Sequence, residues 1–220
     1  MIDLRSDTAT RPSAGMRAAM AAAPVGDEQK REDPTVNELE ALGAALLGQD
    51  EAIFLPTASM ANQIAIRLHT DLGDELVGEE NSHVFISELG GPAVFSGVVT
   101  RGIPGAAGRF SPEQVRAAFR VPSPHSPRTR LVWVENTHNA SGGRIWPLEE
   151  IDELREVCDE LGLRYHLDGA RLLNASAGTG VAAAEIGRRF DTVTLCFSKG
   201  LGCPLGAILA TSEERFEEAW

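Results

Sequence analysis

Short apolar runs alternate along the chain with longer stretches in which apolar residues recur every three or four positions. The short runs predict buried strands, and the periodic stretches predict amphipathic helices. Because strands that alternate with helices are typical of βαβ units, we expect an α/β fold with a mostly parallel sheet flanked by helices. The expected strands are 52–55, 75–77, 98–100, 131–134, 164–167 and 192–197. The expected helices are 16–23, 36–47, 57–69, 147–162 and 181–189, and a further helix begins at Ser111 and Pro112.

The two ends of the chain differ from this regular middle. Residues 1–12 are polar with scattered apolar positions, which indicates an extended arm. Thr35 and Glu38 have the spacing of a capping box, so we expect them to begin the helix that Gly48 ends. Residues 212–220 have the pattern of a helix that stops on an apolar residue soon after it begins. We therefore expect a truncated chain.

Composition limits the function classes. A length of 220 residues suits one large α/β domain, or one domain and part of another. The net charge of −12 argues against nucleic acid or an anionic membrane as partner. No apolar run approaches a membrane span, and the first residues lack the features of a signal peptide. Three cysteines without zinc-like spacing favour a reduced, cytoplasmic protein and no metal site.

One lysine has an unusual position. Lys199 follows the apolar run 192–197 directly and precedes three glycines and a proline within seven residues. An ammonium at the end of a buried strand loses hydration, which favours the neutral, nucleophilic amine that forms an imine with a carbonyl compound. The alternative is a lysine whose stem is buried while its charge reaches water. The neighbouring motifs decide between these interpretations.

Polar residues follow several other expected strands, and in open α/β sheets ligands bind outside the carboxyl ends of strands. Those residues include Thr57, Ser59, His83, Asp168 and Arg171. One chemistry uses them all, namely pyridoxal 5'-phosphate with Lys199 as its Schiff-base lysine.

Five motifs together resemble the low-specificity L-threonine aldolases, which are fold-type-I pyridoxal phosphate enzymes. They are Leu-Arg-Ser-Asp-Thr at 4–8, Glu-Asp-Pro-Thr at 32–35, Glu-Asn-Thr-His-Asn at 135–139, His-Leu-Asp-Gly-Ala-Arg at 166–171 and Ser-Lys-Gly-Leu at 198–201. The resemblance implies the aspartate aminotransferase-like fold. It implies an N-terminal arm at 1–15, a cofactor-binding large domain at 16–220, and a smaller C-terminal domain that this chain lacks.

The resemblance also implies roles around the cofactor. Lys199 would hold pyridoxal phosphate covalently, and Asp168 would pair with the pyridine nitrogen, although an Asp-Gly pair after a strand also suits a helix cap. His83 would stack on the ring, or else be a packed histidine near a turn. The phosphate would bind the segment Thr57, Ala58 and Ser59 where a helix begins, with Ala58 replacing the family's glycine.

The implied substrate ligands are Ser6 and Arg171, because a guanidinium fork matches a carboxylate. Arg171 could instead form a structural ion pair with Asp168. His125 matches a family histidine near the substrate's β-hydroxyl, whose proton an imidazole can take, or it is ordinary surface. Lys30 and Arg31 replace the family's Tyr-Gly pair, which would add charge near the substrate.

The activity implied is retro-aldol cleavage of a β-hydroxy-α-amino acid, threonine or allo-threonine, to glycine and an aldehyde. The alternatives are another pyridoxal phosphate reaction, such as β-elimination or transamination, and a non-catalytic relative or fragment. The resemblance further implies a homodimer or homotetramer.

Overall fold

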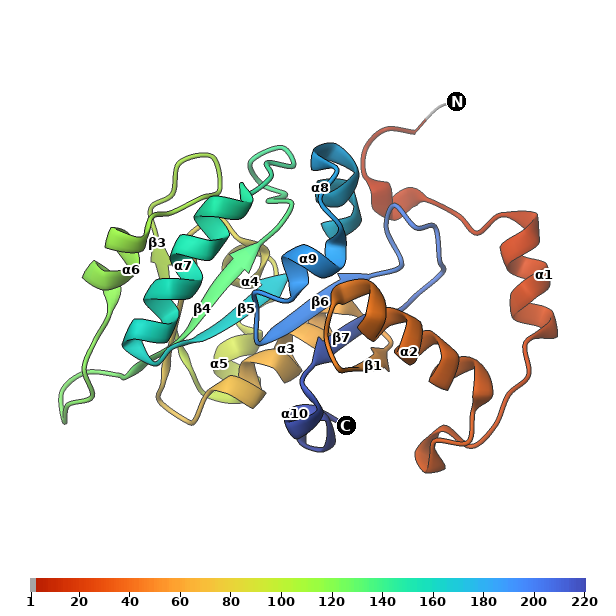
Figure 1. Ribbon diagram of the computed structural model, residues 1–220, viewed down its shortest axis with the longest axis horizontal. Coiled ribbons are helices and arrows are strands. Elements are labelled where there is room, and N and C mark those ends of the chain that lie inside the picture. Colours follow the sequence, from red (N-terminus) through yellow and green to blue (C-terminus); the bar gives the residue numbers. More distant parts are fainter. Residues whose placement is uncertain (1–2) are drawn as a thin grey trace.

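A computed structural model describes residues 3–220, so Met1 and Ile2 of the predicted arm lie outside the described residues. Seven strands form one sheet in the order β1-β7-β6-β5-β4-β2-β3 (Figure 1). Strands β2, β3, β4, β5 and β6 run parallel to one another, whereas β7 runs antiparallel to both β1 and β6. The predicted α/β fold with a mostly parallel sheet is confirmed. The strands are β1 (Glu51–Leu55), β2 (Glu75–Glu79), β3 (Val99–Ile103), β4 (Thr129–Glu135), β5 (Arg164–Asp168), β6 (Thr192–Cys196) and β7 (Ala207–Thr211).

Helices cover both faces of the sheet (Figure 1). The largest apolar cluster joins one face to α2, α6, α7, α8 and α9, and two smaller clusters join the other face to α3, α4 and α10. Burial of these faces is the main stabilising term in a layered α/β domain. The helices are α1 (Ala14–Ala22), α2 (Pro34–Leu47), α3 (Ala58–His69), α4 (His83–Ile86), α5 (Gly91–Ser96), α6 (Pro112–Ala118), α7 (Leu148–Leu161), α8 (Leu172–Thr179), α9 (Ala183–Gly187) and α10 (Glu213–Ala219).

The start of α2 differs from the prediction. Asp33 is the N-cap residue, and its Oδ1 accepts hydrogen bonds from the N–H groups of Thr35 at 3.0 Å and Val36 at 2.9 Å. The predicted capping box of Thr35 and Glu38 is therefore wrong. Pro34 explains the shift, because its fixed φ and missing N–H suit the first helical position.

Strand β7 was not predicted. The glycine-rich loop after Lys199 ends at Gly206, whose φ of +111° is one that side chains rarely adopt. The chain then returns as β7, whose five residues are all buried between β1 and β6. The loop consequently lies at the same edge of the sheet as the carboxyl ends of β4, β5 and β6.

The arm and α1 extend away from the sheet (Figure 1). Helix α1 consists mostly of alanine and methionine and has no buried residue. It begins at Ala14, so the arm interpreted as residues 1–15 shares its last two residues with this helix. In residues 3–220, no helix has the combination of length and apolar character that crossing a membrane requires.

Candidate active site

The carboxyl ends of β4, β5 and β6 bring together the residues that the motifs singled out. Glu135, the last residue of β4, pairs in register with Asp168, the last residue of β5. Asp168 in turn pairs with Thr194 in β6, and Lys199 follows the end of β6 by three residues. Parallel pairing thus places an acid-lined strand edge beside the loop that holds the candidate nucleophile.

Asp168 is buried, and neutral groups satisfy its carboxylate. Its Oδ2 accepts a hydrogen bond from Asn62 Nδ2 at 2.9 Å, and its Oδ1 accepts one from the N–H of Ala170 at 3.1 Å. The N-cap of α8 is Arg171, so Asp168 does not cap that helix. Within residues 3–220 no lysine, arginine or histidine forms an ion pair with Asp168. A buried carboxylate without a cationic partner costs free energy, which a cation bound beside it would reduce.

A second buried acid, Glu88, links Asp168 to His83. Asn62 Nδ2 also donates to Glu88 Oε1 at 2.7 Å, so one amide bridges the two carboxylates. The same Glu88 oxygen lies 3.2 Å from His83 Nδ1. This hydrogen bond raises the pKa of His83 above its ordinary value, and the effect outweighs that of partial burial, which lowers the pKa.

Glu135 holds the backbone around the same edge. Its Oε2 accepts the N–H of His83 at 2.6 Å, and its Oε1 accepts the N–H of Asn139 at 2.8 Å. Burial raises the pKa of Glu135, and the nearby charge of Asp168 raises it further. Since three acids share this edge, a bound cation there would relieve their mutual repulsion.

The N-terminus of α3 lies after the carboxyl end of β1, as the phosphate prediction requires. Thr57 is the N-cap, and its Oγ1 accepts the N–H of Met60 at 3.1 Å. In the described part of the chain, the N–H groups of Ala58 and Ser59 have no acceptor. Free N–H groups and the helix dipole favour an anion at this position.

Arg171 pairs with the arm. Its Nε and Nη2 donate to the two carboxylate oxygens of Asp7 at 2.6 Å and 2.7 Å, which lowers the pKa of Asp7. The alternative pair of Arg171 with Asp168 is thus wrong, because the fork faces Asp7 instead. Ser6 lies next to this contact, but its Oγ accepts the N–H of Thr8 at 3.2 Å and so caps the arm's short turn at Asp7–Ala9.

Lys199 is half-buried in the loop and is in contact with the arm. Its backbone oxygen accepts a hydrogen bond from Thr10 Oγ1 at 2.6 Å. The lysine charge also contributes to the lowered pKa of Asp7, after the larger effect of Arg171. The arm therefore connects the lysine loop to Arg171, a connection that the motifs did not predict.

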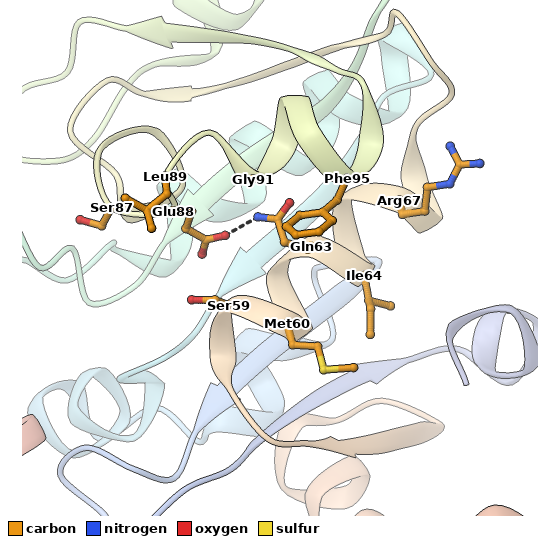
Figure 2. A pocket seen from close by; sticks show the side chains of 10 residues that line it. All are labelled: Ser59, Met60, Gln63, Ile64, Arg67, Ser87, Glu88, Leu89, Gly91 and Phe95. Carbon is orange, nitrogen blue, oxygen red and sulfur yellow. Dashed lines mark hydrogen bonds between the residues drawn. The ribbon is translucent and has the colours of Figure 1, made fainter.

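A cavity of about 560 Å³ adjoins the acid network (Figure 2). One wall is α3 and the other is the segment 87–95, where Glu88 is hydrogen-bonded to Gln63. Its apolar rim is formed by Met60, Leu89 and Phe95, which are 46%, 101% and 71% exposed.

Comparison with known proteins identifies the family. The model of the family described as beta-eliminating lyase matches residues 3–220. The chain belongs to this family. It is 41% identical over 220 residues to the low specificity L-threonine aldolase of Escherichia coli, covering all of this chain and 65% of that protein. It is 39% identical over 222 residues to low-specificity L-threonine aldolase 1 of Arabidopsis thaliana, covering 99% of this chain and 62% of the relative. The chain thus spans about two thirds of the length of these relatives.

Solved structures agree with this membership of the beta-eliminating lyase family. A candidate L-allo-threonine aldolase from Listeria monocytogenes superposes with a TM-score of 0.76 at 26% identity, over 96% of this chain and 59% of that one. A candidate aromatic amino acid beta-eliminating lyase/threonine aldolase from Exiguobacterium gives a TM-score of 0.78 at 27% identity. The match covers 95% of this chain and 58% of that one. The predicted fold-type-I large domain is confirmed.

Two residues that the motifs singled out, His125 and Arg31, lie away from Asp168 within this chain. His125 is exposed in the loop that enters β4, whereas Asp168 lies at the opposite, carboxyl edge of the parallel strands. Arg31 pairs with Glu217 at 2.9 Å and lies over the ring of Phe216 in α10. Helix α10 follows β7 at the amino edge of the parallel strands, so Arg31 lies away from Asp168 within one chain, and the expectation of added charge near the substrate stays a prediction.

The remaining histidines are structural. His69 and His166 are buried, and each bonds the hydroxyl of Thr192, at 2.8 Å and 2.7 Å. His138 is buried against Glu79 at 3.0 Å.

In residues 3–220, one histidine and two acids lie close enough to hold a metal ion. They are His83, Glu88 and Asp168, whose ligand atoms lie within 4.8 Å of one another. The Asn62 amide already donates to both of these carboxylates, so we propose no metal there.

Proposed function

We propose that the protein is a pyridoxal phosphate-dependent lyase that cleaves threonine or allo-threonine into glycine and an aldehyde. The observation that carries this proposal is the buried carboxylate of Asp168 at a strand end beside the loop of Lys199, which pairs with no cation in residues 3–220. The names of the relatives support the choice of reaction, since two of them are L-threonine aldolases.

The residues present fit the cofactor. Lys199 would hold it covalently, Asp168 would keep its pyridine nitrogen protonated, and the free N–H groups of Ala58 and Ser59, with the Thr57 hydroxyl, would bind its phosphate. His83 would cover the ring. When bound, pyridoxal phosphate supplies an electron sink for the pair released as the Cα–Cβ bond breaks. The acids Asp168, Glu88 and Glu135 would stabilise the cationic nitrogen.

Arg171 and Ser6 would bind the substrate carboxylate. Asp7 occupies the guanidinium fork in the described structure, so the substrate would have to displace Asp7 or bind beside it. The exchange conserves the charge and the hydrogen bonds of the guanidinium, because one carboxylate replaces another on the same donors.

Proton transfer from the β-hydroxyl is assigned to a histidine. Glu88 accepts from His83 Nδ1, which leaves Nε2 available, and the raised pKa makes this imidazole a stronger base. His125 stays the other candidate, and its position requires that a second chain supply it.

The test is release of acetaldehyde from threonine and allo-threonine by the cofactor-loaded protein. We expect equal amounts of glycine and acetaldehyde, and we expect Lys199→Ala to abolish both the activity and the visible absorbance of the bound imine. If neither threonine nor allo-threonine released acetaldehyde, the proposal would be refuted. Release of 2-oxobutanoate and ammonia from these substrates would instead indicate β-elimination, the reaction that the family is named for.

We further propose a homodimer or homotetramer in the cytoplasm. Supporting the assembly, α1 has no buried residue, and Val94, Phe95 and Leu89 are each more than 70% exposed beside the cavity at α3. Supporting the compartment, Cys158, Cys196 and Cys203 are free thiols. Analytical ultracentrifugation would test the assembly, and Phe95→Glu is expected to weaken it.

A further inference from the structure

A second cavity, of about 490 Å³, lies at the opposite edge of the sheet from Asp168. Its lining comes from the amino ends of the parallel strands β4 and β5, the turn that enters β6, the last turns of α7 and the segment after α9. Five arginines surround it, although the whole chain carries a net charge of −12. They are Arg130, Arg155, Arg164, Arg188 and Arg189.

Three of these guanidinium groups are neutralised by carboxylates. Arg155 pairs with Asp159 at 2.5 Å and with Asp191 at 3.2 Å. Arg164 lies 3.7 Å from the same Asp191, and Arg189 pairs with Asp152. Three carboxylates therefore balance three arginines, which leaves an excess of two positive charges around the cavity.

The excess resides on Arg130 and Arg188. Within residues 3–220 neither forms an ion pair, and Arg130 donates only to the carbonyl oxygen of Gly162, at 3.1 Å. Partial burial lowers the pKa of Arg130, and the charges of Arg128 and Arg164 lower it further, whereas the charge of Asp74 acts in the opposite direction. The Arg155 Nε is buried without an acceptor in the same described residues.

We propose that this cavity binds a small anion that carries phosphate groups, of nucleotide size or smaller. Guanidinium forks match phosphate oxygens in a bidentate way, and two unpaired forks suit a doubly charged group. The volume lies within the range of about 300–1,000 Å³ that is typical of small-ligand sites. Because the cavity faces the amino edge, its ligand is separate from the phosphate proposed at the start of α3.

Calorimetric titration of the cofactor-loaded protein in a phosphate-free buffer tests the proposal. Loading fills the phosphate position near Ser59, so that this position does not contribute to the signal. The probes are inorganic phosphate, pyrophosphate and ATP. We expect saturable binding of pyrophosphate or ATP with one molecule per chain, weakening as the salt concentration rises. A lack of saturable binding by all three probes would overturn the proposal.

Matched variants locate the site. Arg130→Gln and Arg188→Gln each remove one unpaired guanidinium and are expected to weaken binding about tenfold or more. Arg116→Gln removes an exposed arginine that pairs with Glu160 outside the cavity, and it should leave affinity unchanged. If both cavity variants bound the probes as tightly as the parent protein, the cavity would not be the binding site. Since Arg188 is exposed, its variant tests the proposal even if Arg130→Gln folds poorly.

Discussion

The guanidinium of Arg171 donates two parallel hydrogen bonds to the carboxylate of Asp7, 164 positions earlier in the chain. A carboxylate on this fork has the geometry that a substrate carboxylate would need. The arm is thus held by the same group that is proposed to recognise the substrate.

Asp7→Asn should free this fork. The side chains of Arg171 and Asp7 are each about three-quarters buried or more. Loss of their ion pair corresponds to about 1 kcal/mol, or about a fivefold change in the affinity of Arg171 for a substrate carboxylate. We expect KM for threonine to fall by about that factor with little change in kcat, as steady-state kinetics would measure. Asp3→Asn is the matched control, because Asp3 pairs with the exposed Arg5 and not with Arg171 in the described residues. A large increase in KM for Asp7→Asn would show instead that Asp7 orients Arg171.

The same pair predicts an acid-dependent stability. Because Arg171 lowers the pKa of Asp7 below 3.8, the pair stabilises the fold fully above that value, and the contribution is lost as pH falls through the lowered pKa. Urea unfolding of the parent and of Asp7→Asn should therefore show a constant difference near neutral pH that shrinks in acid. A difference that grew as the pH fell would contradict this account.

Glu88→Gln should lower the pKa of His83. The carboxylate supplies the main effect that raises this pKa, and a neutral amide cannot replace its charge. NMR titration of the His83 ring would measure the shift. If His83 transfers the proton, kcat should also fall by about tenfold and its pH profile should move toward acid. An unchanged titration of His83 would refute the coupling, and Glu80→Gln is a control at a nearby acid.

Asp168→Asn should leave the fold intact but impair catalysis. An amide of the same shape keeps the contacts to Asn62 and Ala170 only in part and cannot hold a proton on the pyridine nitrogen. We expect kcat to fall on the order of 10²–10³-fold while the cofactor stays bound. Absorbance spectra and acetaldehyde assays would separate the two effects. Retention of full activity would remove Asp168 from the mechanism.

The position of His125 predicts complementation between chains. If His125 acts in the site of a neighbouring chain, mixed assemblies of Lys199→Ala and His125→Ala should contain some intact sites. We expect these mixtures to regain part of the activity that each variant lacks, after unfolding and joint refolding or co-expression. Mixtures no more active than the separate variants would place His125 outside the reaction.

The local pattern of the sequence determined most of the elements and the place of the chemistry. Apolar runs marked β4, β5 and β6, and the polar residues that follow them, Asp168 and Lys199, necessarily lie at one edge when such strands pair in parallel. Strand β7 escaped prediction because its direction depends on the loop geometry at Gly206 and on pairing with β1 and β6.

Tertiary structure alone decided which side chains meet. Asn62 reaches Glu88 across 26 positions and Asp168 across 106, and no spacing rule in a single sequence relates such residues. The same holds for the pairing of Arg171 with Asp7 and for the placement of His125 at the opposite edge from Asp168, because neither follows from spacing in the sequence. Local patterns report which segments bury an apolar face, whereas contacts between segments depend on how those faces pack together.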